Sequence, residues 1–260
     1  MIGACFIGDI DLKKITKMIL IIILLGIFIY CIYNIINYLN NSKKNEKLTK
    51  ELQNVAIKEI PQNNKMENNE NKSEAPIEVD FNKLKETNSN IYAWIYMEDS
   101  IINYPIVKGN DNSFYLNHSI DGKYNTNGTL FVDCRNTDNF EDMVTYIYGH
   151  HMKNNTMFGN LEFFKEQNYY DNHKEMYLFT KEKNYKLELF AGFTVADGSK
   201  IYNYINTKSN EEIVQYAKDK SNFESNVEIL PENKIVVLST CSYDYENARY
   251  VLLGVLKEMR

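Results

Sequence analysis

Arginine, cysteine and histidine are scarce in this sequence, and each shortage limits what the protein can be. Of its 29 Lys and Arg residues, only Arg135, Arg249 and Arg260 are arginines. The formal net charge is −6, and no stretch interleaves basic with aromatic residues. A nucleic acid is therefore not an expected partner.

The cysteines are too few for more than one disulfide in the folded part of the chain. Cys5 and Cys31 lie before or within a long apolar segment, which leaves Cys134 and Cys241. These two could form a bridge in an oxidising compartment. We expect two free thiols instead, with Cys134 buried. A disulfide would leave the arrangement of Cys241 with Arg249, described below, without a function.

A long uncharged segment near the N-terminus predicts a membrane span. Residues 18–42 carry no charge, and Ile and Leu dominate the first part, enough for a helix across a hydrocarbon layer of about 30 Å. Lys13, Lys14 and Lys17 precede it as in a cleavable signal peptide, but no small-residue cleavage site follows. We expect an uncleaved signal anchor at 18–40 after a cytoplasmic segment, 1–17. Lysines flank both ends, so the positive-inside rule leaves the orientation open.

The next segment, 41–79, is rich in Asn, Lys and Glu and has few large apolar residues. Such a composition predicts a stalk that cannot fold alone, although a short helix over 44–57 is allowed before Pro61. The folded domain is then expected to be 80–260. Asp80 can cap its first helix, which carries Phe81 and Leu84 on one side.

After that helix the sequence is rich in short β-branched and aromatic runs separated by polar turns. Such a pattern predicts a closed or nearly closed β-barrel. The expected strands cover residues 93–97, 101–107, 129–133, 143–148, 176–180, 185–195, 234–241 and 249–256.

The connection between the sixth and seventh of these strands is too long for a turn. Ser209 and Glu212 have the spacing of a capping box, and Ile213, Tyr216 and Ala217 follow on one helical face. We expect a helix of about three turns here, outside the barrel. A long loop beside a strand end also often walls a binding groove.

The ends of the last two strands hold a thiol and a guanidinium. If strands 234–241 and 249–256 form a hairpin, Cys241 closes one and Arg249 opens the next, at the same rim. Alone, Cys241 would pass for a small buried residue and Arg249 for a surface charge. Arginine is rare here, however, and only its planar fork can offer two parallel donors to an oxyanion.

A histidine ends another predicted strand in the same way. The strand 143–148 is followed by Gly149, His150 and His151, whereas His118 and His173 lie in polar loops and are expected to be solvated. Cys, His and Arg together can catalyse acyl transfer. The thiolate attacks a carbonyl, the imidazolium protonates the leaving amine and the guanidinium stabilises the oxyanion.

These residues stand in motifs that resemble class B sortases, the membrane-anchored cysteine transpeptidases of Gram-positive bacteria. The sortase signature Thr-Leu-x-Thr-Cys corresponds to residues 237–241, which depart from it only at Val237. Further segments similar to this class are 94–95, 104–107, 111–116, 128–131, 148–150 and 157–158, and the long helical connection is also typical. The resemblance covers residue 80 to the end, together with the N-terminal anchor.

The resemblance implies an eight-stranded sortase barrel outside the membrane, in a single-pass protein. The enzyme would cut a sorting signal similar to Asn-Pro-x-Thr-Gly or Asn-Pro-x-Thr-Asn after its Thr and pass the acyl group to a peptidoglycan amine. It implies that Cys241 is the nucleophile, His150 the general acid and base, and Arg249 the oxyanion and substrate clamp. Matching groove residues are Asn112, Leu116, Tyr204, Ile205 and Ser239.

Two other functions stay open at this point. A cysteine peptidase that only hydrolyses would use the same three residues, and a tethered adhesin or wall-binding module would use none of them. No cofactor is implied. No metal site is expected either, because the acidic residues of the long connection lack the spacing of a calcium loop.

The adjacent histidines should differ in role. Successive side chains of a strand point to opposite faces, so His150 and His151 cannot both face Cys241. The resemblance assigns the chemistry to His150, and the reaction should have a bell-shaped pH profile, because it needs a thiolate and an imidazolium together.

Overall fold

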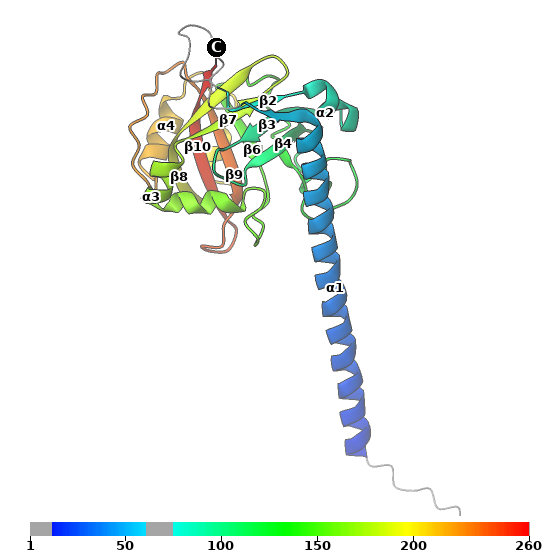
Figure 1. The fold of residues 1–260 in the computed structure, drawn as a ribbon. Helices are drawn as coiled ribbons and strands as arrows, with labels where there is room; N and C mark the ends of the chain where they lie inside the picture. Colours follow the sequence, from blue (N-terminus) through cyan, green and yellow to red (C-terminus); the bar gives the residue numbers. More distant parts are fainter. Residues whose placement is uncertain (1–11, 61–74, 260) are drawn as a thin grey trace, which may run out of the picture. The chain divides into compact units, whose positions relative to one another are not determined.

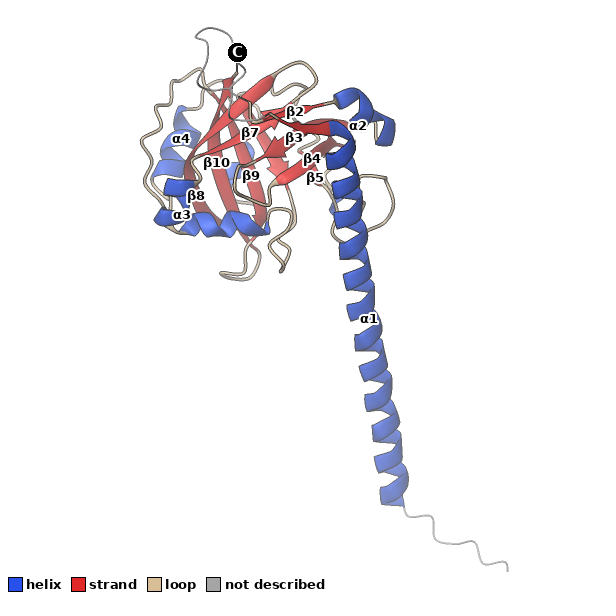
Figure 2. Cartoon of the chain, viewed as in Figure 1, coloured by secondary structure: helices blue, strands red, loops and turns tan. Residues whose placement is uncertain are grey.

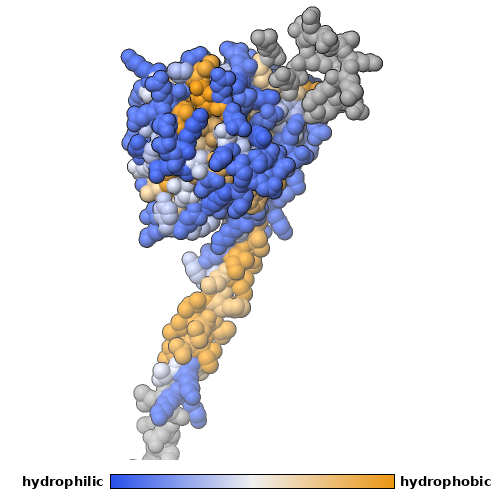
Figure 3. Space-filling model, turned by 90° about the vertical axis from the view of Figure 1, so that its left-hand side faces the viewer, coloured by the Kyte–Doolittle hydropathy of each residue, from blue (hydrophilic) through white to orange (hydrophobic). Residues whose placement is uncertain are grey.

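The computed structural model describes residues 12–60 and 75–259, which fall into two compact units, Met1–Lys44 and Asn45–Arg260. The first unit contains the beginning of helix α1, Leu12–Ala56. Within α1 the apolar side chains of residues 18–39 are exposed and form a continuous band (Figure 3). Among the described residues, α1 is the one helix long and apolar enough to cross a membrane, as the sequence predicts.

The second unit is built on a closed barrel of eight strands, which confirms the predicted fold (Figures 1 and 2). Around the barrel the order is β10-β8-β7-β3-β4-β5-β6-β9. The pairs β4/β5 and β6/β9 are parallel, and the other pairs are antiparallel. Every strand begins and ends within two residues of its predicted position. The strands are β3 (Ile91–Tyr96), β4 (Asn103–Lys108), β5 (Leu130–Val132), β6 (Val144–Tyr148), β7 (Glu175–Phe179), β8 (Asn184–Ala196), β9 (Lys234–Cys241) and β10 (Ala248–Glu258).

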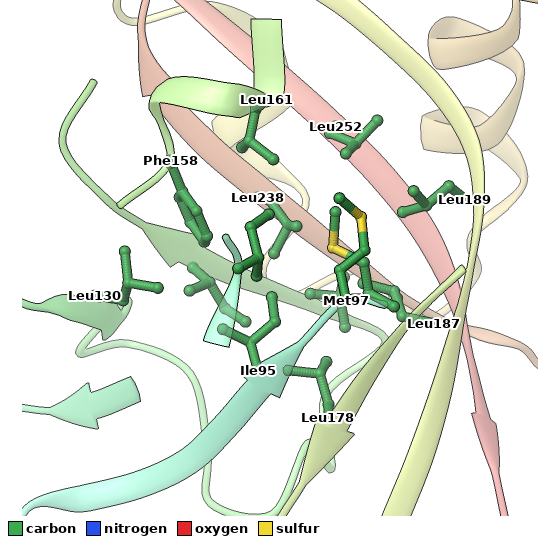
Figure 4. Close-up of a cluster of buried hydrophobic side chains, with 14 of the residues drawn as sticks. Ile95, Met97, Leu130, Phe158, Leu161, Leu178, Leu187, Leu189, Leu238 and Leu252 are labelled. Carbon is green, nitrogen blue, oxygen red and sulfur yellow. The ribbon is translucent and has the colours of Figure 1, made fainter. Parts of the chain in front are cut away.

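Strands β9 and β10 are buried on both faces, which explains their uninterrupted apolar sequences. Leu238 and its cross-strand partner Leu252 point into the barrel, where fully buried side chains from other strands surround them (Figure 4). Val237 and its partner Leu253 belong to a second cluster on the opposite face. Each fully buried aliphatic side chain contributes about 1.5–3 kcal/mol, so this hairpin is a rigid base for whatever its end carries.

Short helices decorate the barrel: α2 (Phe81–Thr87), α3 (Gln167–Asn172), α4 (Glu211–Lys218) and the 3-10 segments η2 (Phe114–Leu116), η3 (Gly159–Lys165) and η4 (Lys200–Asn203). Asp80 caps α2 as predicted, because its carboxylate accepts from the Asn82 and Lys83 amides at 3.1 and 3.2 Å.

Helix α4 exists where predicted but is shorter and begins later. Its N-cap is Asn210, whose amide group instead donates to the carbonyls of Leu230 and Asn233, both at 2.7 Å, and so ties down the end of the long connection. The capping box does not form, because the Glu212 carboxylate accepts from the Tyr204 hydroxyl at 2.9 Å. Buried Ile213 and Ala217 still supply the predicted apolar face.

The folded domain begins earlier than residue 80. Helix α1 ends at Ala56, one residue before the end of the short helix that the sequence allows over 44–57. Its last turns bury Leu52 and Ala56 in a cluster with Trp94. A two-stranded sheet follows, β1 (Ile57–Glu59) paired with β2 (Ile77–Val79), in which Ile77 is buried. Much of the expected stalk therefore packs on the barrel. Leu48, Leu52 and Ala56 stand four residues apart and share one helical face, but the polar composition of the segment hides this face. Residues 61–74 lie outside the described part.

Candidate active site

The hairpin of β9 and β10 brings the predicted thiol and guanidinium together. Cys241 and Arg249 are direct cross-strand partners in the antiparallel register. Paired residues of an antiparallel ladder project to the same face of the sheet. The inference that both side chains stand at one rim of the barrel is therefore confirmed.

His150 reaches the same rim through a different neighbour of β9. Strand β6 runs parallel to β9, with Tyr148 paired to Ser239, and the Gly149 amide donates to the Ser239 carbonyl at 3.1 Å. Both strands consequently end at the same level. Gly149 is required at this point, because a Cβ there would lie 2.3 Å from a methyl group of Leu130.

A cleft of about 360 Å³ lies at this rim and contains all three predicted catalytic residues. It is lined by Asn112, Leu116, Phe131, Tyr148, Gly149, His150, Asp197, Gly198, Tyr202, Ser239, Thr240, Cys241 and Arg249. Three of the five predicted groove residues, Asn112, Leu116 and Ser239, are among them.

The imidazole of His150 is oriented by a backbone carbonyl. Its Nε2 lies 2.6 Å from the carbonyl oxygen of Leu116. A carbonyl can only accept, so Nε2 carries the proton and Nδ1 is the nitrogen left for proton exchange.

Arg249 is held at the edge of the cleft by two weaker contacts. One terminal nitrogen donates to the Ala248 carbonyl at 3.1 Å, and the other lies 3.4 Å from an oxygen of Asp197. Asp197 is largely exposed, so this ion pair orients the guanidinium and adds little stability. Two of the five N–H donors are engaged, which leaves donors for a ligand in the cleft.

Tyr202, which the sequence did not single out, forms part of the cleft wall together with Tyr148. The Tyr202 hydroxyl lies 2.9 Å from the Ser239 hydroxyl, and its ring is 6.4 Å from that of Tyr148. Burial raises the pKa of Tyr202 to about 12, so it stays a neutral hydrogen-bonding group.

The opposite part of the wall rests on an ion pair between a buried carboxylate and a half-exposed arginine. Asp133 is fully buried and accepts from Arg135 at 2.9 and 2.7 Å and from the Tyr148 hydroxyl at 2.9 Å. Asn112 is fixed next to it, because its side-chain oxygen accepts from the Cys134 amide at 2.8 Å. Two cleft residues, Tyr148 and Asn112, are thus anchored from behind.

Two predicted groove residues lie elsewhere. Tyr204 and Ile205 are buried in the hydrophobic cluster beneath α4 and do not line the cleft. The segment η4 ends at Asn203, so the chain turns Tyr202 toward the cleft and the next residues into the cluster. The resemblance pointed to the connection that does contribute to the cleft, but it did not predict which side chains of that connection face the cleft.

The other predictions about cysteines and metals can be compared with the structure as well. Cys134 and Cys241 are free thiols, but Cys134 is only half-buried, so the prediction that it is buried is wrong. Within residues 12–60 and 75–259, no group of three or more His, Cys, Asp and Glu side chains is placed to hold a metal ion.

Comparison with known proteins agrees with this geometry. The family model for the sortase domain matches residues 95–257. The chain belongs to the sortase family. It is 30% identical to sortase B of Listeria monocytogenes serovar 1/2a (strain ATCC BAA-679 / EGD-e) over 245 residues, which cover 91% of this chain and 95% of that protein.

Two solved structures show the same relationship. Sortase B from B. anthracis is 29% identical with a TM-score of 0.69, and the match covers 85% of this chain and 99% of that one. The Staphylococcus aureus sortase B–substrate complex is 28% identical with a TM-score of 0.65, covering 68% and 84%. The chain is thus a class B sortase, a cysteine transpeptidase of the cell wall.

Proposed function

We propose that this sortase cleaves an Asn-Pro-x-Thr-Gly or Asn-Pro-x-Thr-Asn type of sorting signal after the Thr and transfers the surface protein to a peptidoglycan amine. The observation that carries the proposal is the meeting of Cys241, His150 and Arg249 in one cleft. Asn112, Leu116 and Ser239 line the cleft beside the nucleophile, where they could contact an extended peptide.

Acylation begins when the Cys241 thiolate attacks the Thr carbonyl of the signal. The carbon–sulfur bond forms, and the carbonyl oxygen becomes an oxyanion beside the Arg249 guanidinium. Loss of one oxyanion donor typically raises a barrier by about 3–4 kcal/mol. The carbon–nitrogen bond then breaks, and His150 gives a proton to the leaving amine, with its ring held by the Leu116 carbonyl.

Transfer reverses these roles. The amine of a peptidoglycan precursor or cross-bridge attacks the thioester carbonyl, and a new carbon–nitrogen bond replaces the carbon–sulfur bond. His150 takes the proton that the amine loses, which restores the imidazolium, and Cys241 leaves as a thiolate. The same residues would support hydrolysis with water as acceptor, so the acceptor distinguishes a transferase from a peptidase.

We also propose a single-pass membrane topology, with the barrel outside the cell and the partners in the wall. The uncharged stretch of α1, preceded by Lys13, Lys14 and Lys17, supports an uncleaved anchor. Protease added to intact cells should remove the barrel domain. Protection from that protease, or a mature N-terminus beyond Tyr38, would contradict this topology.

The activity can be tested with the full-length protein in detergent. It is incubated with a library of sorting-signal peptides, with and without hydroxylamine or diaminopimelate, and the products are identified by mass spectrometry. We expect one bond to be cut, after Thr, and amine adducts to form. Hydrolysis products alone at saturating amine would indicate a peptidase. Peptide turnover that survives alkylation of Cys241, or no turnover at all, would count against the proposed chemistry.

A further inference from the structure

The loop of residues 242–247 joins the nucleophile to Arg249, and its first residue is fixed from the side away from the cleft. Ser242 is buried, and its amide donates to the Ala248 carbonyl at 2.9 Å, which closes the hairpin. Its hydroxyl donates to an oxygen of Glu162 at 2.5 Å. The residue directly after Cys241 is therefore attached to segment η3, which lies 80 positions earlier in the chain.

Glu162 belongs to a chain of alternating charges that extends across this loop. Lys165 of η3 donates to Glu162 at 3.0 Å and to Asp244 at 2.7 Å. The other oxygen of Asp244 accepts from the Thr194 hydroxyl of β8 at 2.6 Å. The loop is consequently held at Ser242 and at Asp244, between η3 and a barrel strand.

These groups are charged at neutral pH. Burial opposes the charge of Glu162, but hydrogen bonds from Ser242 and Lys165 lower its pKa overall. The hydrogen bond from Lys165 also lowers the pKa of Asp244, with help from Thr194. Charge-assisted hydrogen bonds between partly buried groups are stronger and more directional than neutral ones. These charge-assisted hydrogen bonds therefore fix the position of the loop 242–247 more firmly than neutral polar contacts would.

A further contact reaches the nucleophile itself. Nδ1 of His151 lies 2.9 Å from the carbonyl oxygen of Cys241, so that nitrogen must be the donor. The same atom is 3.9 Å from Glu162. His151, Glu162, Lys165 and Asp244 are all absent from the lining of the cleft. Their hydrogen bonds reach the nucleophile through residues 241–244.

We propose that Glu162 is a positioning residue, which acts through Ser242 to fix the peptide after Cys241 and with it the direction of the thiol. Cys241 is the last residue of β9, so the ladder alone holds it from one side only. Displacement of a reacting group by about 1 Å can cost about 100-fold in rate. The inference rests on the proposed function, because peptide turnover is its main measure.

The test compares Glu162→Gln with Glu166→Gln in the full-length protein. Both replace a carboxylate by an amide of the same shape, but the Glu166 side chain is exposed and has no hydrogen bond to any of the residues that the structure describes. For Glu162→Gln we expect kcat to fall about tenfold with KM within twofold, because the cleft itself is unchanged. Glu166→Gln should match the parent. Ser242→Ala, which deletes only the hydroxyl, should repeat the loss in kcat and carries the test if Glu162→Gln does not fold.

A kcat within twofold of the parent for both Glu162→Gln and Ser242→Ala would overturn the proposal, and so would a rise in KM that equals the fall in kcat. The rate of alkylation of Cys241 by iodoacetamide is measured on the same samples. If the unsubstituted protein cuts no peptide, the proposed function is refuted, but the positioning role of Glu162 is not. The positioning role would then be judged by alkylation, which should change severalfold in Glu162→Gln but not in Glu166→Gln.

Discussion

The two sides of the β9–β10 hairpin differ in how firmly their side chains are held. On the cleft side, Arg249 makes one ion pair with an exposed carboxylate and one bond to its neighbour's carbonyl. On the other side, Ser242 and Glu162 belong to a continuous set of short hydrogen bonds. The Arg249 guanidinium thus keeps freedom to follow a substrate, while the backbone that carries it is fixed from behind.

This difference suggests a division of labour between the two sides. Groups that must form new hydrogen bonds in a transition state should not have all their donors and acceptors occupied by the protein beforehand. Groups that fix the distance and direction of the reacting side chains should have all their hydrogen bonds made within the protein. Substitutions on the cleft side should therefore affect chemistry strongly with little change in stability, and those behind the hairpin should give smaller losses of rate.

The largest effect is expected for the nucleophile. Cys241→Ala should abolish peptide cleavage, because Cys241 is the one thiol that lines the cleft within residues 12–60 and 75–259, and the domain should stay folded, because Cys241 lies at a rim. Turnover by mass spectrometry and thermal unfolding measure both. Unchanged turnover by the purified variant would remove Cys241 from the mechanism.

The adjacent histidines compare the two sides directly. His150→Ala should remove activity, because His150 lines the cleft. His151→Ala should keep activity within a fewfold, because it deletes one bond to the Cys241 carbonyl and leaves Ser242, Glu162 and Lys165 in place. Steady-state kcat/KM of the two purified variants tests the pair. The reverse result would assign the general acid to His151.

Arg249→Lys keeps the charge and removes the planar fork. We expect turnover to fall about 100-fold or more, because a lysine cannot contact the oxyanion and remain held by Asp197 at the same time. Steady-state rates at saturating peptide measure the effect. Near-normal rates would mean that charge alone is sufficient.

The smallest effect concerns the ion pair behind the cleft wall and appears as stability. Burial opposes the charge of Asp133, but Arg135 and Tyr148 lower its pKa from 3.8 to about 2. A lowered pKa gives stability above the unfolded value that is lost as the pH falls through the folded one. Between about pH 5 and pH 2 the parent should lose about 2 kcal/mol more unfolding free energy than Asp133→Asn. Urea titrations at both pH values test this, and equal losses would contradict it.

Much of the barrel was predictable because its strands have strong local patterns. The runs at 234–241 and 249–256 are apolar on both faces, and the structure buries both. The pairing of Cys241 with Arg249 could be predicted from the position at which the first run ends and the second begins. Short polar turns between such runs leave few alternatives for pairing neighbours.

The remainder depends on contacts between distant parts of the chain. Leu52 and Ile77 lie in a segment of polar composition, and only the barrel surface reveals that they are buried. Asp197 precedes η4 and Tyr202 belongs to it, and both line the cleft. No local pattern in the sequence indicates that these two side chains face the cleft. Glu162 and Lys165 could have been noticed as opposite charges at i and i+3, but their link to Ser242 could not.

The parallel pairing of β6 with β9 has a consequence for folding. It brings together His150 and Cys241, which are separated by 91 positions, so no short segment of the chain contains both residues. Pairings of such long sequence separation form slowly. A chain in which β6 and β9 have not paired carries its thiol without the histidine, so the recovery of peptide turnover during refolding would report this pairing.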